Sequence, residues 1–583
     1  MKELSIDIET YSSEDLLKTG VYRYAEAPDF TILLFAYAFD DEDIQIVDLA
    51  SGEALPEKIT EALTNPKIIK TAYNANFERT CIAAYLKMPM PPEQWRCSAV
   101  AAAELGLPQT LAGVAEALGL QEQKDARGKA LINYFSKPCK PTKVNGGRTR
   151  NLPQHDSEKW AVFKEYCVQD VAVERAIKKK ISRFPMAESE QRLWEVDQHI
   201  LDCGVAADSL LAQNAILYNK AHKESCKEQL QRLTGIANVN SVAQLKRWIE
   251  ERTGEVVPSL DKKNLKAILT TTKDEILKNV LRLRAETAKT SVAKYEAVER
   301  SVCKDGRVRG ILQFYGANRT GRWAGRILQV QNLPQNHLQD LDLARELVRG
   351  GEYDIFRMLF PVPQTLSELI RTVLIPSDGC RFIVSDFSAI EARVIAYLAD
   401  ETWRLNVFAE GGDIYCASAS QMFHVPVVKH GINGHLRQKG KVAELACGYG
   451  GSVGAMKAMG GSGMSDAELK QIVTDWRTAS PHIVQLWWDV ENAAIKAVRD
   501  KTETETHGIH FSYESGFLFI KLLSGRRLAY VKPRIGENRF GGDSITYEGI
   551  GTGRKWERLE TYSGKLVENI VQATAPYKKP SVI

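Results

Sequence analysis

The sequence predicts an α/β fold for its first 185 residues and a mixed α and β architecture for the remainder. In the first part, Leu4–Ile8 alternates apolar and polar residues and Thr31–Tyr37 is a continuous apolar run, so both indicate strands. Trp160–Ile181 has apolar residues at helical spacing. Strands that alternate with helices in this way are typical of helices packed on a sheet.

The remaining residues change pattern several times. The pattern is helical over about 186–305, mixed over 306–430, helical again over 431–500, and strand-like with loops over 505–583. A length of 583 residues suggests three or four domains, at about 100–200 residues per domain.

Composition excludes several classes of protein. Hydrophobic residues make up 44% and charged residues 26% of the chain, which is ordinary globular usage and excludes a disordered or fibrous protein. No uncharged apolar run reaches the length of about 18 residues that a membrane span needs. The 10 cysteines include no Cys-x-x-Cys pair, so neither a zinc site nor a disulfide framework is indicated and we expect a reduced, cytoplasmic protein.

Carboxylates gather at three places in the first domain. Asp7 and Glu9 lie two apart on a predicted strand, so both side chains leave the same face. Glu78 follows an Asn and a Phe, and Tyr166 and Asp170 lie four apart on one face of a predicted helix. Each feature alone is more often a solvated acid or a packed tyrosine. Together and in this order they resemble the three motifs of proofreading 3′→5′ exonucleases with an RNase H-like fold, in the tyrosine subclass.

This resemblance implies two-metal chemistry. Asp7, Glu9, Glu78 and Asp170 would hold two Mg²⁺ ions about 4 Å apart, with Mn²⁺ as a substitute. Tyr166 would orient the attacking water. The second motif of the family usually ends in Asp, whereas this chain has Glu78, a hard oxygen ligand that is one methylene longer.

A second set of motifs lies between residues 316 and 460. The apolar run Phe382–Asp386 is predicted to be a strand that carries Asp386 at its end, and Glu391 follows about one helical turn later. Four residues spaced by four form one stripe on a predicted helix: Arg437, Lys441, Leu445 and Tyr449. One such stretch alone is usually a capped turn or a solvated helix face. The Asp386 stretch followed by the helical stripe, in this order, resembles motifs A and B of the family A DNA polymerases, the bacterial DNA polymerase I type.

The resemblance implies a role for each of these residues. Asp386 would bind metal, and Arg437 and Lys441 would hold the triphosphate of an incoming dNTP. Tyr449 would lie at the template base and pack on Glu391. Leu445 stands where many members of the family have Phe or Tyr. The segments that resemble the primer–template contacts of the family contain Arg319, Thr320, Arg322, Gln331, Asn332 and Gln572.

The resemblance runs from about residue 3 to 575 and implies an RNase H-like exonuclease domain followed by a right-hand polymerase. It assigns 1–185 to the exonuclease domain, 186–305 to a helical thumb or linker, 306–430 to the palm, 431–545 to the fingers, and 546–583 to a partial return to the palm. Primer–template DNA and dNTPs are the implied partners, no membrane is involved, and no processivity or accessory protein can be named.

One expected motif is missing. The family continues after the Gln572 helix into motif C, a His-Asp-Glu-like turn, whereas this chain reads Pro576–Ile583, and Pro576 would break that helix. We therefore expect a C-terminally incomplete palm, through truncation or a shift of reading frame, and impaired polymerisation. Three interpretations stay open: a proofreading DNA polymerase of phage-type replication or of repair, a Mg²⁺-dependent exonuclease with a DNA-gripping but inactive polymerase module, and a non-catalytic DNA-binding remnant.

Overall fold

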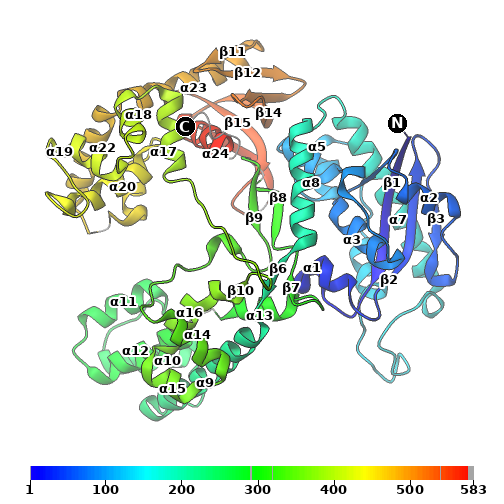
Figure 1. Ribbon diagram of the computed structural model, residues 1–583, viewed down its shortest axis with the longest axis horizontal. Coiled ribbons are helices and arrows are strands. Elements are labelled where there is room, and N and C mark those ends of the chain that lie inside the picture. Colours follow the sequence, from blue (N-terminus) through cyan, green and yellow to red (C-terminus); the bar gives the residue numbers. More distant parts are fainter. Residues whose placement is uncertain are drawn as a thin grey trace.

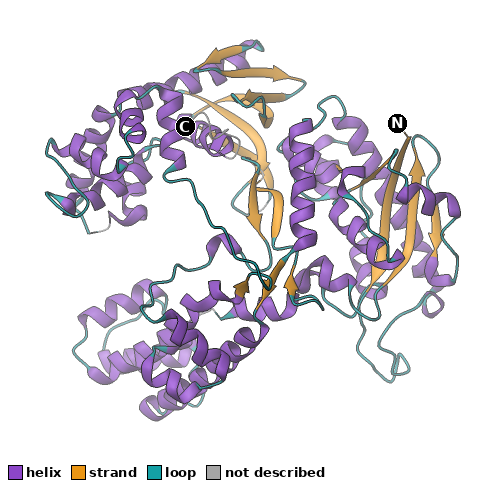
Figure 2. Ribbon diagram, viewed as in Figure 1, coloured by secondary structure: helices purple, strands orange, loops and turns teal. Residues whose placement is uncertain are grey.

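The computed structural model describes residues 2–288, 292–317, 319–461, 463–538, 540–553 and 555–575. The chain folds into an N-terminal α/β domain, a helical lobe, and a second helical lobe joined to an antiparallel sheet (Figure 1). In the described part of the chain, strands occur in the N-terminal domain, in a small junction and in the last part of the sequence (Figure 2). The segment Pro576–Ile583, where the sequence predicts that motif C is missing, lies outside the described residues. No helix among those described is long and apolar enough to cross a membrane.

The N-terminal domain has a five-stranded mixed sheet of order β3-β2-β1-β4-β5. Its strands are β1 (Lys2–Tyr11), β2 (Thr31–Phe39), β3 (Gln45–Asp48), β4 (Ile68–Ala72) and β5 (Trp95–Cys97). β1 pairs antiparallel with β2 and parallel with β4. The helices are α1 (Leu16–Ala25), α2 (Glu57–Thr64), α3 (Ala75–Leu86), α4 (Ser98–Glu104), α5 (Leu111–Leu118), α6 (Gly128–Phe135) and α7 (Ser157–Ile181). The predicted α/β fold is confirmed, and α7 packs on β1 and β2.

The helical lobe contains α9 (Ser209–Thr234), α10 (Val242–Thr253), α11 (Lys262–Thr271), α12 (Glu275–Thr287) and α13 (Ala293–Ser301). It also takes in α14 (Leu341–Gly350), α15 (Tyr353–Leu359) and α16 (Val362–Leu369), which the sequence had assigned to the palm. Their apolar residues Ala344, Phe356 and Leu366 share one buried cluster with Leu211 of α9, so these helices pack with the lobe, and the palm boundary stays a prediction. The apolar faces of α14, α15 and α16 are therefore buried against the helical lobe, although these helices follow it in the sequence.

A junction connects this lobe to the rest of the molecule. α8 (Glu188–Cys203) runs along the N-terminal domain, where Arg79 of α3 forms a salt bridge with Asp202 at 2.7 Å. The short strands β6 (Val205–Ala207), β7 (Arg307–Val308) and β10 (Leu374–Ile375) form a small sheet of order β10-β6-β7. A hairpin of β8 (Leu312–Ala317) and β9 (Arg322–Gly325) follows.

The second helical lobe contains α17 (Ile390–Ala399), α18 (Thr402–Ala409), α19 (Ile414–Phe423), α20 (Arg437–Cys447), α21 (Val453–Met456) and α22 (Asp466–Ala479). α23 (Pro481–Asp500) leads into six antiparallel strands that pair in sequence order: β11 (Thr504–Thr506), β12 (Ile509–Glu514), β13 (Phe517–Lys521), β14 (Arg527–Glu537), β15 (Asp543–Ile550) and β16 (Trp556–Thr561). α24 (Ser563–Thr574) closes the described chain.

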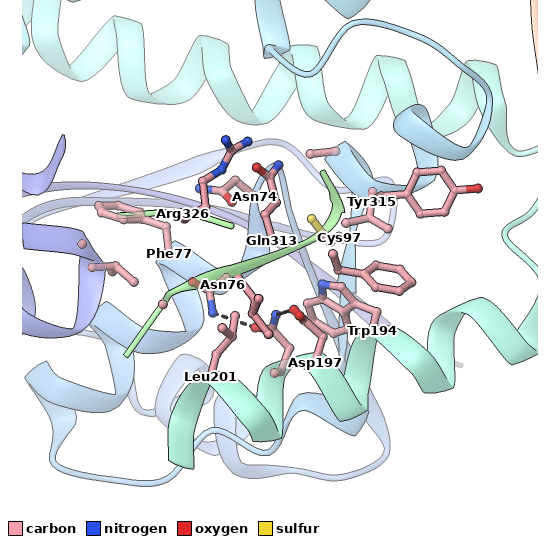
Figure 3. Close-up of a pocket in the computed structure, with 18 of the residues that line it drawn as sticks. Asn74, Asn76, Phe77, Cys97, Trp194, Asp197, Leu201, Gln313, Tyr315 and Arg326 are labelled. Atoms are coloured by element: carbon pink, nitrogen blue, oxygen red, sulfur yellow. Dashed lines mark hydrogen bonds between the residues drawn. The ribbon is translucent and has the colours of Figure 1, made fainter. Parts of the chain in front are cut away.

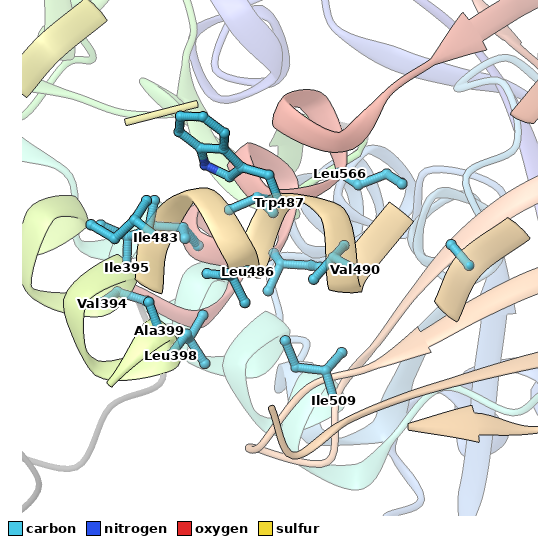
Figure 4. Close-up of a cluster of buried hydrophobic side chains, with 14 of the residues drawn as sticks. Val394, Ile395, Leu398, Ala399, Ile483, Leu486, Trp487, Val490, Ile509 and Leu566 are labelled. Atoms are coloured by element: carbon cyan, nitrogen blue, oxygen red, sulfur yellow. The ribbon is translucent and has the colours of Figure 1, made fainter. Parts of the chain in front are cut away.

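One apolar core joins this sheet to the second helical lobe. Trp487 and Val490 of α23 lie between α17 and α24, and Ile509 of β12 and Leu566 of α24 belong to the same buried cluster (Figure 4). The strands over 504–550 therefore pack as a unit with α24, although the sequence had divided them between fingers and palm at residue 545. The boundary at residue 545 falls inside β15, whose two neighbours hold it by backbone hydrogen bonds.

The predicted strand Phe382–Asp386 is wrong. Residues 376–389 cross from β10 to α17 as an extended connection, and none of the described strands pairs with them (Figure 1). Ile383 and Val384 are 87% and 89% exposed. A strand is held by hydrogen bonds to its neighbours, so an apolar pattern alone does not produce one here.

Candidate nuclease and polymerase sites

The carboxylates predicted for the nuclease converge from three elements. Asp7 and Glu9 lie on β1, Glu78 lies in the first turn of α3, and Asp170 lies on α7, which packs against β1. Asn74 makes the turn from β4 into α3 with a left-handed backbone, at φ 71°, and so sets the start of the helix that carries Glu78. Glu9, Glu78 and Asp170 are 8%, 4% and 4% exposed.

These carboxyl groups are costly to ionise together. Burial raises the pKa of Asp7, Glu9 and Glu78 well above the ordinary range, and the charges of neighbouring carboxylates raise them further. Within the described part of the chain, Glu78 Oε2 and Asp170 Oδ1 are buried without a hydrogen-bond partner. Hard oxygen ligands in such a cluster suit a divalent cation, so the residues fit the metal site that the resemblance implies.

Two further side chains belong to this cluster, and sequence reasoning missed both. Lys124 Nζ forms an ion pair with Asp170 and lies 4.8 Å from the centre of the Tyr166 ring. Glu174 is buried one helical turn after Asp170, accepts a hydrogen bond from Ser98, and its charge raises the pKa of Glu78. Helical spacing from Asp170 could have pointed to Glu174, whereas nothing in the spacing of Lys124 pointed to the site.

Tyr166 is held by close packing. Its ring is 1% exposed and stacks on Phe163, with 6.1 Å between the ring centres. A Cβ atom on Gly128 of α6 would lie 2.1 Å from Cε2 of Tyr166, so only glycine allows this approach. Burial raises the pKa of the Tyr166 hydroxyl, and the charge of Glu9 adds to the shift, so the hydroxyl stays protonated.

Glu391 and Tyr449, one from each polymerase-like motif, meet just past the end of α20, so Tyr449 lies beyond the helix on which the sequence had placed it. The Tyr449 hydroxyl donates a hydrogen bond of 2.7 Å to Glu391, and Arg322 of β9 lies 3.7 Å from the same carboxylate. Arg437 Nε bonds Asp413 at 2.8 Å. Along the stripe that the sequence indicated, Lys441 and Leu445 are exposed.

The buried side of α20 is fixed by an ion pair. Arg404 of α18 binds both carboxylate oxygens of Glu444 at 2.7 and 2.8 Å, and Trp476 donates to the same group at 2.8 Å. A bidentate pair of this kind fixes the orientation of both side chains. α20 therefore presents its opposite face, with Lys441, to solvent. Asp386 is also exposed, but it lies on the extended connection rather than at the end of a strand.

The predicted DNA contacts divide into exposed and buried residues. Arg322, Gln331 and Asn332 are exposed, and Gln572 is half-buried on α24 with a 3.4 Å hydrogen bond to Glu568. Thr320 is only 5% exposed, so little of its surface is open to DNA, and its role as a DNA contact stays a prediction. Arg319 bonds the carbonyl oxygen of Ala529 and packs on the Tyr530 and Tyr547 rings, which turns its guanidinium towards β14 and β15.

Comparison with known proteins agrees with this arrangement. Residues 210–507 match the model of DNA polymerase family A. A DNA polymerase of Bacillus phage SP02 is 58% identical over 580 residues, which cover 99% of this chain and 89% of that protein. The chain belongs to DNA polymerase family A. The thermostable DNA polymerase I of Thermus aquaticus is 35% identical over 90 residues, 15% of this chain and 11% of that protein.

A solved structure supports the fold of this family A polymerase. It is the POL domain of Pol1 from M. smegmatis, in complex with DNA primer-template and dNTP. The similarity has a TM-score of 0.55 at 15% sequence identity, and covers 98% of this chain and 81% of that chain. The α/β domain followed by a polymerase fold, as the sequence predicts, is confirmed.

In this polymerase a cavity of about 500 Å³ lies between the N-terminal domain, α8 and the β8–β9 hairpin (Figure 3). Asn76 of α3 donates to Gln198 at 2.8 Å, and Gln198 donates to Asp197 at 3.1 Å. Trp323 of the hairpin donates to Asp197 at 2.7 Å. The helix that carries Glu78 is therefore connected by hydrogen bonds to the polymerase half.

Proposed function

We propose that this family A DNA polymerase also hydrolyses the 3′ end of DNA at the carboxylate cluster of its N-terminal domain. The convergence of Asp7, Glu9, Glu78 and Asp170 carries the proposal. Buried carboxylates with raised pKa values destabilise a folded domain unless a cation neutralises them. Lys124 is the one cation that bonds to these four carboxylates within the described residues, which leaves most of their charge for metal ions.

Each residue of the carboxylate cluster has a distinct role in the proposed hydrolysis. Two Mg²⁺ ions, replaceable by Mn²⁺, would be held by the four carboxylates and would supply Lewis-acid activation of water and neutralisation of phosphate charge. The protonated Tyr166 hydroxyl donates a hydrogen bond to the attacking water and so orients it. Lys124 supports Tyr166 through the face of its ring.

For synthesis, we propose that primer–template DNA and a dNTP bind along the exposed face of α20. Arg437 and Lys441 would bind the triphosphate, because both cations lie on one helical stripe. The hydrogen-bonded pair of Glu391 and Tyr449 would lie at the nucleotide sugar and the template base. Asp386 would hold metal, Leu445 would contact the nucleotide, and the DNA contacts would include Arg322, Gln331, Asn332 and Gln572.

A primer assay tests both activities. Purified protein is incubated with a 5′-labelled primer on a longer template and Mg²⁺, with and without dNTPs. We expect shortening of the primer without dNTPs, and its loss in Asp7→Asn. An unshortened primer, with DNA binding intact, would refute the nuclease. Asp386→Asn should abolish any extension while leaving shortening unchanged.

A second candidate function is an exonuclease whose polymerase half binds DNA without extending it. The exposed, unpaired segment around Asp386 favours this candidate, since a metal carboxylate needs rigid support to work. The same assay separates the two: shortening in both lanes supports the exonuclease alone, and extension with dNTPs supports the polymerase.

A further inference from the structure

Three side chains of different chemistry converge in the helical lobe, far from both sites described above. His222 and Cys226 lie four residues apart on α9, so they share one face of that helix. Glu286 lies in the last turn of α12, which packs along α9. One ligand atom from each residue lies within 4.8 Å of the other two.

The separations are close to those of a tetrahedral metal centre. His222 Nε2 lies 2.9 Å from Glu286 Oε2, and Cys226 Sγ lies 3.4 Å from that nitrogen and 3.8 Å from that oxygen. Zinc bonds of about 2.0 Å to nitrogen or oxygen and about 2.3 Å to sulfur put ligand atoms about 3.3–3.5 Å apart. Each of the three separations therefore needs to change by no more than about 0.4 Å.

The three ligand atoms face one another and differ in their access to solvent. His222 Nε2 lies against both the Glu286 carboxylate and the Cys226 thiol, and that thiol also lies 3.8 Å from the same carboxylate oxygen. Cys226 is 2% exposed, so its thiol is shielded from water, while His222 and Glu286 reach the surface. A cation placed among the three atoms would bond all of them and could enter from the solvent side.

We propose that His222, Cys226 and Glu286 form a binding site for a zinc-like divalent cation, with a water molecule as the fourth ligand. A thiolate, an imidazole and a carboxylate together are a borderline-soft ligand set that favours Zn²⁺ over the hard cation Mg²⁺. This site is separate from the carboxylate cluster of the nuclease, where every ligand is an oxygen.

The bound ion would connect two helices of the lobe. α9 contributes two ligands and α12 the third, so the ion adds a tertiary link between segments about sixty residues apart in the chain. A ligand that binds only the folded state stabilises it, and the stabilisation grows with the logarithm of the ligand concentration relative to the dissociation constant. The helical lobe should therefore unfold at a higher temperature when the ion is bound.

Cobalt provides the direct test, because Co²⁺ occupies zinc sites and its bond to a thiolate gives an ultraviolet charge-transfer band. The full-length protein is freed of metal with a chelator, kept reduced, and titrated with Co²⁺ in excess Mg²⁺. We expect the band to saturate at one equivalent and to disappear when Zn²⁺ is added. The absence of the band in excess Mg²⁺, or its disappearance when the Mg²⁺ concentration is raised without Zn²⁺, would overturn the proposal.

Variants assign the band to these residues. Cys226→Ala should abolish it, and Glu286→Gln should weaken Co²⁺ binding at least about 10-fold. Cys303→Ala is the matched control, because Cys303 is equally buried and lies outside the cluster, and it should keep the full band. A band that survives in Cys226→Ala, or is lost in Cys303→Ala, would refute the assignment. Since Glu286 is partly exposed, Glu286→Gln tests the site even if Cys226→Ala fails to fold.

Discussion

Gly128 offers a sharp test of how Tyr166 is positioned, because the substitution Gly128→Ala leaves every proposed ligand in place. The added Cβ would lie 2.1 Å from the Tyr166 ring, whereas ordinary contact begins at 3.4 Å. The ring must therefore move by about 1.3 Å, the difference between these distances. It has little room, since it is 1% exposed and stacked on Phe163.

A displacement of about 1 Å in a group that orients a reactant costs about 100-fold in rate, and overpacking costs about 1–3 kcal/mol in stability. We expect Gly128→Ala to lower the rate of 3′-end hydrolysis by about 100-fold, as Tyr166→Phe should through loss of the hydroxyl. The assay follows a 5′-labelled single strand in Mg²⁺, below the melting temperature measured by circular dichroism.

Gly454→Ala is the control for an added methyl group, since a Cβ at Gly454 meets no atom within 4 Å. It should hydrolyse DNA at the rate of the unmodified protein. If Gly128→Ala also keeps that rate while remaining folded, either the position of Tyr166 does not matter to the reaction or the proposed nuclease site is wrong. Loss of DNA binding in Gly128→Ala would instead indicate a general defect in folding.

Three further predictions follow from the same geometry. Asp7→Asn should lower 3′-end hydrolysis about 100-fold or more but raise the melting temperature in chelator, because it removes one buried charge; a lower melting temperature would contradict this. In chelator, stability measured by thermal unfolding should fall as pH rises from about 4, because the folded pKa values of Asp7, Glu9 and Glu78 lie above their unfolded values and ionisation then opposes folding. Mg²⁺ should reverse that loss, and a stability that rises with pH in chelator would refute the account. Tyr449→Phe removes a hydrogen bond to a charged group worth about 1.5–3 kcal/mol, so it should lower the melting temperature and weaken dNTP binding; unchanged values of both would show that this bond is not needed.

Much of the N-terminal fold could be predicted because its signals are local. The apolar run of β2 and the helical spacing of α7 each lie within one element, and the structure has both at those positions. The expected strand at Phe382–Asp386 failed for the opposite reason. A strand depends on a neighbour that supplies hydrogen bonds, and the apolar pattern of the segment carries no information about whether that neighbour is present.

The same division applies to the sites. By itself the sequence indicated Asp7 with Glu9, Tyr166 with Asp170, and the α20 stripe, because strand and helix periods determine which nearby side chains share a face. Only the tertiary structure brought Lys124 to Asp170 and Gly128 to Tyr166.

The cluster of His222, Cys226 and Glu286 depends on tertiary packing in the same way. Its ligands come from two helices, so the absence of a Cys-x-x-Cys pair in the sequence said nothing about it. Such contacts join residues far apart in the chain, and their distances are set by how whole helices pack rather than by any spacing along the sequence.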